Sequence, residues 1–281
     1  MAIIAGGLPA KGVSMSADII EHQVIGGDMQ AVVVTLDPGE AVVAEAGAMM
    51  YLEDGIEMGT ALSMKKDAPG LLGRLFEAGK RAVTGDSFFI TFFTNNARER
   101  RNAAFAAPYP GHIVPIRLED HQGEILCQKD AFLCAARGVS VDIAFTRRIG
   151  AGLFGGEGFI LQKLSSPDRR GQAFLHAGGT VIRRELAQGE TLKVDTGCLV
   201  GFESTVDYDI QLVPGIKNKL FGGEGLFYVR LTGPGTIWLQ TLPFSRMCDR
   251  IIAAAPSAGG SRRGEGSVLG GLGALLDGDN S

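Results

Sequence analysis

The chain repeats one short pattern three times, and this repetition limits the folds that are open to it more than any other feature of the sequence. Three segments align without gaps: "PGEAVVAEAGAMM" (38–50), "QGEILCQKDAFLC" (122–134) and "QGETLKVDTGCLV" (188–200). Each begins with Gly-Glu, continues with apolar residues and reaches a small residue at Gly47, Ala131 or Gly197. The pattern predicts a turn that leads into a strand.

A second trio follows the first at matched distances. The segments are "TGDSFFITFFT" (84–94), "GGEGFILQKLS" (155–165) and "GGEGLFYVRLT" (222–232), each a glycine-rich turn before an apolar strand. The acidic residues of the two trios are 33 residues apart in the middle unit, 34 in the last and 46 in the first. Self-similarity at such a period predicts an internal repeat. The dozen or so extra residues of the first unit hold "GLLGRLFEAGKRAV" (70–83), whose apolar spacing predicts an inserted amphipathic helix.

We therefore predict an all-β fold in which three pseudo-repeats form a single body over residues 1–255. The repeats span about 16–107, 108–175 and 176–244, and a short helix follows at 245–255. Residues 256–281 contain many glycines and little periodicity, which predicts a flexible tail. Strands this short cannot close a core within one repeat, so the three repeats should pack together.

The composition fits a soluble protein of a reducing compartment. There are 41 glycines among 281 residues, which favours many tight turns, and the net charge of −4 argues against binding nucleic acid through overall charge. The four cysteines show no CxxC pairing and read as buried free thiols. Without a convincing signal peptide or a long uncharged apolar run, we expect a cytoplasmic protein.

The glycine-rich turns are candidate ligand sites, although a structural role explains them as well. The residues concerned are Gly156, Glu157, Gly158, Gly223, Glu224 and Gly225. They lack the lysine of a phosphate-binding loop, and an acid at the centre of such a loop would repel phosphate. We interpret them as repeated tight turns; the alternative is a loop that contacts a ligand at a boundary between repeats or subunits.

Two arginine pairs recur before successive strands. Arg100 and Arg101 precede Phe105 as Arg169 and Arg170 precede Phe174. Solvated hairpin tips are the plain interpretation. The alternative is a basic rim for an anionic partner such as RNA, a nucleotide or a lipid headgroup, although few aromatic residues lie nearby to stack on bases.

No pattern in the sequence indicates catalysis. The four histidines do not stand at metal-ligand spacing, there is no nucleophile elbow, and the carboxylates are scattered through turns. We therefore expect neither a metal nor a cofactor, and we expect a non-enzymatic protein.

Together with the repeated strands, "FLHAGGTVIRREL" (174–186) and "LPFSRMCDRI" (242–251) resemble the bacterial proteins related to the "altered inheritance of mitochondria" protein of yeast. The resemblance covers residues 16 to 255. It implies three tandem units similar to the tryptophan RNA-binding attenuation protein (TRAP), each a distorted double-stranded β-helix, and a homotrimer whose nine units form a ring. It brings no catalytic residues. A homo-oligomeric scaffold, serving a membrane-associated assembly or partner protein, is the leading hypothesis; a module that binds RNA or a small ligand is the alternative.

Overall fold

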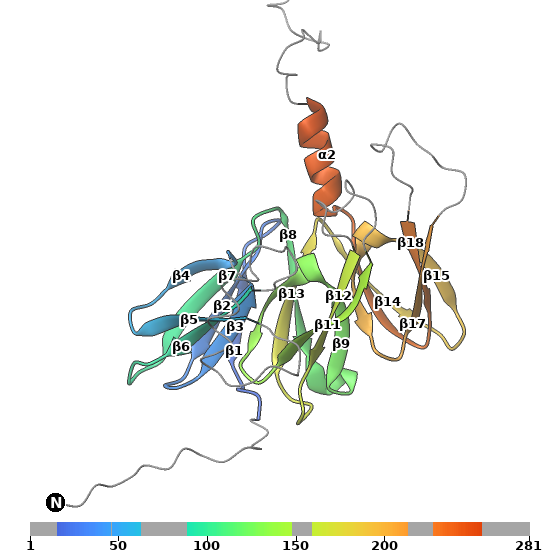
Figure 1. The fold of residues 1–281 in the computed structure, drawn as a ribbon. Helices are drawn as coiled ribbons and strands as arrows, with labels where there is room; N and C mark the ends of the chain where they lie inside the picture. The colour runs from blue at the N-terminus through green and yellow to red at the C-terminus, as the bar shows by residue number, and fades with distance from the viewer. Residues whose placement is uncertain (1–15, 46, 63–88, 148–158, 213–226, 255–281) are drawn as a thin grey trace, which may run out of the picture. The chain divides into compact units, whose positions relative to one another are not determined.

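The computed structural model describes residues 16–45, 47–62, 89–147, 159–212 and 227–254. In this part of the chain, β-strands joined by tight turns predominate, and the single α-helix is α2 (Phe244–Ala254) (Figure 1). The predominantly β fold is thereby confirmed, and α2 lies where the sequence predicts the terminal helix. Residues 1–244 form one compact unit and residues 245–281 a second. The predicted inserted helix at 70–83 and the tail at 256–281 lie outside the described residues.

Among the described residues, the strands that follow β1 (Glu21–Ile25) fall into three sets of six. Set one contains β2 (Ala31–Leu36), β3 (Ala41–Glu45), β4 (Met49–Leu52), β5 (Ile56–Leu62), β6 (Phe89–Asn95) and β7 (Arg101–Ala106). Set two contains β8 (Gly111–Arg117), β9 (Glu124–Gln128), β10 (Phe132–Ala136), β11 (Ser140–Arg147), β12 (Phe159–Ser165) and β13 (Gln172–Gly178). Set three contains β14 (Val181–Leu186), β15 (Thr191–Asp195), β16 (Leu199–Glu203), β17 (Asp207–Leu212), β18 (Phe227–Thr232) and β19 (Gly235–Gln240).

One antiparallel pairing scheme describes all three sets. In each set the first strand pairs with the sixth and the sixth with the third, while the second pairs with the fifth and the fifth with the fourth. The third strand also carries a register shift at the same place in each set, between Met49 and Tyr51, Phe132 and Cys134, and Leu199 and Gly201. Each set therefore contributes two half-sheets of three strands.

Neighbouring sets are joined edge to edge. β3 of set one pairs with β10 of set two, and β9 of set two pairs with β16 of set three. These two junctions give six-stranded sheets of the order β5-β6-β3-β10-β13-β8 and β11-β12-β9-β16-β19-β14. The half-sheets at the two ends of the chain stay separate: one is β2-β7-β4 with β1 added beside β2, and the other is β15-β18-β17.

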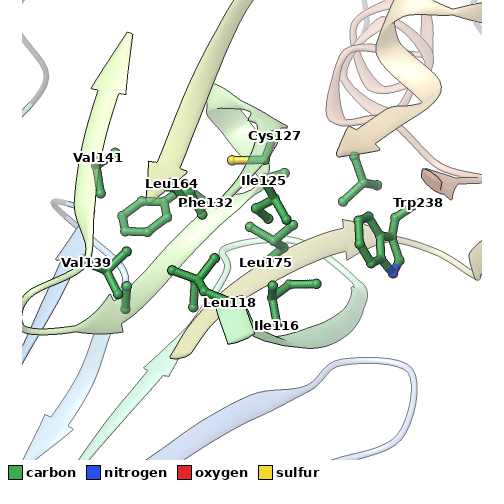
Figure 2. Close-up of a cluster of buried hydrophobic side chains, with 14 of the residues drawn as sticks. Ile116, Leu118, Ile125, Cys127, Phe132, Val139, Val141, Leu164, Leu175 and Trp238 are labelled. Atoms are coloured by element: carbon green, nitrogen blue, oxygen red, sulfur yellow. The ribbon is translucent and has the colours of Figure 1, made fainter. Parts of the chain in front are cut away.

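Three hydrophobic clusters fill the spaces between successive sheets. One joins the β1-β2-β7-β4 sheet to the first six-stranded sheet and includes Val34, Phe105, Phe93 and Phe174. The next joins the two six-stranded sheets through Ile116, Leu175, Ile125 and Trp238, and Figure 2 shows it with Trp238 at one end. The third joins the second six-stranded sheet to β15-β18-β17 through Phe159, Phe202, Val229 and Leu231. The central strands of the six-stranded sheets, such as β3, β10 and β16, therefore bury both of their faces, which explains their apolar sequences.

The Gly-Glu turns of sets one and three are built alike. Gly39 and Gly189 adopt positive φ angles of 86° and 73°, the left-handed region that glycine enters at little cost. The next residue, Glu40 or Glu190, turns its carboxylate back to accept a hydrogen bond from the backbone N–H three residues earlier, at 2.8 and 2.9 Å. The glutamate of each turn therefore closes the turn.

The corresponding turn of set two is shifted by one residue from the ungapped alignment. Gln122 takes the left-handed conformation there, with φ of 60°. The carbonyl of Gly123 accepts the cross-strand hydrogen bond from Ser166 that Glu40 accepts from Asn95 in set one. Glu124 therefore belongs to β9, where it forms an ion pair with Lys163. The shift accompanies extra residues that form the 3-10 helix η2 (Leu118–His121) before the turn.

Candidate functional site

The half-sheets β2-β7-β4 and β15-β18-β17 each end in an edge strand, β4 or β15. The strands at the same place in the other sets pair with a strand of a neighbouring set. The third strands of sets two and three, β10 and β16, are joined to the second strand of the preceding set, but β4 has no such neighbour among the described residues. In the same way β15, the second strand of set three, ends its sheet, although β3 and β9 continue into the next set. The described residues therefore leave two edges without a neighbouring set: β4, a third strand, and β15, a second strand.

The β4 edge exposes large apolar side chains at positions that are buried elsewhere. Met49, Met50 and Tyr51 are 40%, 59% and 41% exposed. At the corresponding register positions of β10 and β16, the exposed fractions are 0–3% for Phe132, Leu133, Cys134, Leu199 and Val200. A row of exposed apolar residues on an edge strand is a site for strand addition.

The β15 edge is more polar. Val194 points into the third cluster and is 6% exposed, while Thr191 and Lys193 face solvent. Lys193 stands where β3 has Val43 and β9 has Leu126, and its Nζ lies 5.1 Å from the centre of the Tyr228 ring. Lysine on an edge strand opposes unspecific strand pairing, because its charge must stay in contact with water.

The two arginine pairs, interpreted as solvated hairpin tips with a basic rim as the alternative, differ in their surroundings. Arg100 donates to Asp37 at 2.6 Å and to Glu21 at 2.7 Å, and these hydrogen bonds raise the pKa of its guanidinium. Arg101 donates to the carbonyl of Asp54 and to Glu99, at 2.9 and 3.1 Å. The acceptors for the first pair thus come from the chain itself, which reduces its charge toward an external anion.

The second pair lies in the turn before β13. Arg169 adopts a positive φ of 61°, and the backbone N–H of Arg170 donates to Asp168 at 3.1 Å. Hydrogen bonds from Ser16 and Ser166 hold the pKa of Asp168 well below its usual value, so a carboxylate stands at this tip too. Binding of an anion by Arg169 and Arg170 remains a prediction. The glycine-turn residues Gly156, Glu157, Gly158, Gly223, Glu224 and Gly225 lie outside the described residues.

A hollow of about 690 Å³ opens between β8, β14 and β19, and sequence reasoning missed it. At one side, His121 of η2 lies 2.7 Å from the Glu203 carboxylate, Nδ1 to Oε1, and its ring meets Trp238 edge-on with centroids 5.2 Å apart. Glu203 also accepts from the Thr236 N–H at 2.9 Å. Burial raises the pKa of Glu203, but these hydrogen bonds outweigh burial and leave its pKa below the usual value. The sequence carries no signal for the hollow, because His121 meets Glu203 and Trp238 only through the junction of β9 with β16.

Other titratable groups are buried without converging on a site. Burial raises the pKa of the Cys127 and Cys134 thiols, which removes them as nucleophiles at neutral pH. Among the described residues, no group of three or more His, Cys, Asp or Glu side chains gathers as a metal site requires. The same residues contain no helix that is long and apolar enough to cross a membrane.

His176 on β13 predicts an acid-sensitive stability. The residue is 2% exposed and packs edge-on against Tyr109 at 4.5 Å, and burial lowers its pKa to about 4. Because the unfolded chain binds the proton near pH 6.5, stability is complete above that pH and falls as the pH drops toward 4. We expect His176 to cost about 2 kcal/mol between pH 7.5 and 5. Urea unfolding of the wild type and His176→Leu at both pH values measures this, and an equal loss in the two proteins would contradict it.

Comparison with known proteins gives three findings. The family model described as mitochondrial biogenesis AIM24 matches residues 22–242. An uncharacterised protein of Streptococcus pyogenes serotype M6 is 27% identical over 226 residues, which cover 80% of this chain and 86% of that protein. The crystal structure of a Streptococcus pyogenes protein, from a structural genomics programme, is similar with a TM-score of 0.63 and 23% identity, over 84% of this chain and all of the other. At this identity the likeness shows the fold alone.

Proposed function

The chain belongs to the mitochondrial biogenesis AIM24 family, as its resemblance predicts, and on that premise we propose that it is a non-enzymatic scaffold that assembles with copies of itself. The three sets of strands are three tandem TRAP-like units in this proposal. One pairing scheme and one position for the register shift in all three sets support the units.

The observation that carries the assembly is that the two terminal half-sheets complement each other. Joining β15 of one copy to β4 of the next gives the order β17-β18-β15-β4-β7-β2. Both six-stranded sheets within the chain have this order. Each contains the fourth, fifth and second strands of one set, followed by the third, sixth and first strands of the next set. The contact between copies would then repeat a contact that the chain already makes twice.

The two internal junctions also specify the register of the contact. Cys134 lies opposite Ala44 in one junction, and Gly201 lies opposite Cys127 in the other. The corresponding residues at the free edges are Tyr51 and Val194, followed by Leu52 opposite Lys193. Both junctions give the same answer, so a single register is expected between copies.

Side-chain packing supports this register, with one exception. Tyr51 would cover Val194 beside the third cluster, and Met49 and Met50 would leave water. Lys193 stands at the position that the apolar residues Val43 and Leu126 occupy in the other two sets. Its aliphatic stem would lie along Leu52, while its ammonium group stays solvated. We infer that Lys193 discourages pairing with strands other than β4.

Such a contact joins two different surfaces and therefore repeats from copy to copy until it closes. A head-to-tail contact produces a ring when the rotation per copy closes and a filament when it does not. The TRAP-like arrangement favours a ring of three copies with nine units. Arg100 and Arg101 already donate to acceptors of the chain itself, which makes the alternative of an RNA-binding module the weaker proposal.

Native mass spectrometry of the full chain tests the proposed assembly. We expect a closed species of three times the 29.6 kDa chain mass at micromolar concentration. A monomer under the same conditions would contradict the scaffold, and an open series of larger species would contradict closure while supporting the contact.

A further inference from the structure

The hollow at His121 is the open counterpart of a space that is filled elsewhere in the chain. Phe174 and Trp238 occupy the same position in their sets, because each lies opposite the residue that follows the register shift, Cys134 or Gly201. At Phe174 the N-terminal segment closes the space: Ile20 is 2% exposed in the cluster, and the His22 ring meets Phe174 edge-on at 4.8 Å. At Trp238, among the residues that the structure describes, His121 takes such a place, and the hollow lies beside it.

The hollow is not built to receive a strand in the manner of β1. β1 pairs along β2, with Gln23 opposite Val33. On β8 the residue at the place of Val33 is Pro115, since each lies opposite the equivalent residue of the sixth strand. Proline donates no hydrogen bond and keeps its ring on the free side of an edge strand, so it blocks the addition of a strand there. A small molecule is left as the occupant that the geometry accepts.

The residues that line the hollow determine the charge and the apolar group that a bound molecule would carry. Three carboxylates, Asp120, Glu185 and Glu203, stand against the single guanidinium of Arg183. Each carboxylate has a partner, since Arg183 contacts Glu185 at 3.0 Å, Arg117 lies 3.8 Å from Asp120 and His121 lies 2.7 Å from Glu203. The three carboxylates still outnumber the two guanidiniums, which favours a cation over an anion. Val114 and Pro115 supply the apolar surface that a ligand can contact, because Ile116, Leu186 and Trp238 are 2–3% exposed and lie beneath it.

We propose that this hollow binds a small organic amine, with an ammonium group facing the carboxylates and an apolar body against Val114 and Pro115. The volume is within the range of small-molecule sites. The site lies within one chain, between sets two and three, so it does not depend on the assembly proposed above. The carboxylates would provide the charge selection, and the apolar wall would remove the body of the ligand from water.

Trp238 is the only tryptophan of the chain, so its emission reports on the hollow alone. The full-length protein is titrated with 2-phenylethylamine, with the neutral 2-phenylethanol and with the anionic 3-phenylpropionate, and calorimetry in parallel detects binding that leaves the emission unchanged. We expect saturable binding of the amine that is at least about tenfold tighter than that of either analogue.

Two variants separate charge selection from a general apolar effect. Asp120→Asn combined with Glu185→Gln should weaken the amine by about tenfold and leave the alcohol unchanged. Asp142→Asn combined with Glu57→Gln, an equal change of charge at exposed positions of β11 and β5, is the control and should have no effect. No saturation by the amine in either measurement, equal affinity for the three probes, or an unaffected double variant would each overturn the proposal.

Discussion

Met50→Asp should dissociate the assembly into single chains. In the proposed contact the Met50 side chain, 59% exposed in the chain alone, becomes buried as Leu133 and Val200 are in the internal junctions. A carboxylate at that place would lose its water without gaining a partner, which costs several kcal/mol for a buried unpaired charge. We expect association at least about 100-fold weaker, corresponding to about 3 kcal/mol. Light scattering over a dilution series measures the change in mass.

The chain offers a closely matched control in Met58→Asp. Met58 lies on β5, which also ends a sheet, and it has the same exposed fraction of 59%. The proposed contact does not include β5, so this variant should keep the mass of the wild type. Circular dichroism of both variants confirms that each is folded. A Met50→Asp variant with wild-type mass, or equal dissociation of the two variants, would contradict the contact.

The fold class could be predicted from the sequence because tight turns and apolar strands leave a local signal. The paired trios at 38–50, 122–134 and 188–200, and at 84–94, 155–165 and 222–232, correspond to the second and fifth strands of each set, which pair with each other. Spacing alone thus located strands that become neighbours. The strand that joins one set to the next could not be predicted, since edge pairing between distant segments has no sequence motif of its own.

The limits of ungapped alignment are visible at Gln122. A side chain other than glycine took the left-handed position there, so matching the letters Gly-Glu placed Glu124 in the turn rather than in β9. Because side chains alternate between the faces of a strand, this single residue decides which side chains enter which cluster. Ile125 and Cys127 accordingly enter the cluster between the two six-stranded sheets, and Leu126 enters the next one.

The candidate sites were less predictable than the fold. The arginine pairs were visible as a repeat, but their partners Glu21 and Asp37 come from other strands, and their ion pairs appear only in three dimensions. The hollow was invisible for the same reason: His121, Glu203 and Trp238 are far apart in the sequence and meet only through the junction of β9 with β16. A lone histidine in a turn gives no warning of such a neighbour.

The central claim is that β15 of one copy pairs with β4 of another in the register of the internal junctions. Residues directly opposite each other in an antiparallel pair lie close enough for a disulfide. We therefore expect Tyr51→Cys with Val194→Cys, in a background with Cys198→Ser and Cys248→Ser, to cross-link chains upon mild oxidation. Cys127 and Cys134 are buried and can remain.

The displaced pair Tyr51→Cys with Thr191→Cys is the register control, because its residues would lie three positions out of step. Denaturing electrophoresis without reductant measures the result most directly. The proposed contact predicts chains joined in covalent multimers for the Tyr51 and Val194 pair, largely single chains for the displaced pair, and loss of the multimers with reductant. Single chains for both pairs, or equal cross-linking of both, would contradict it.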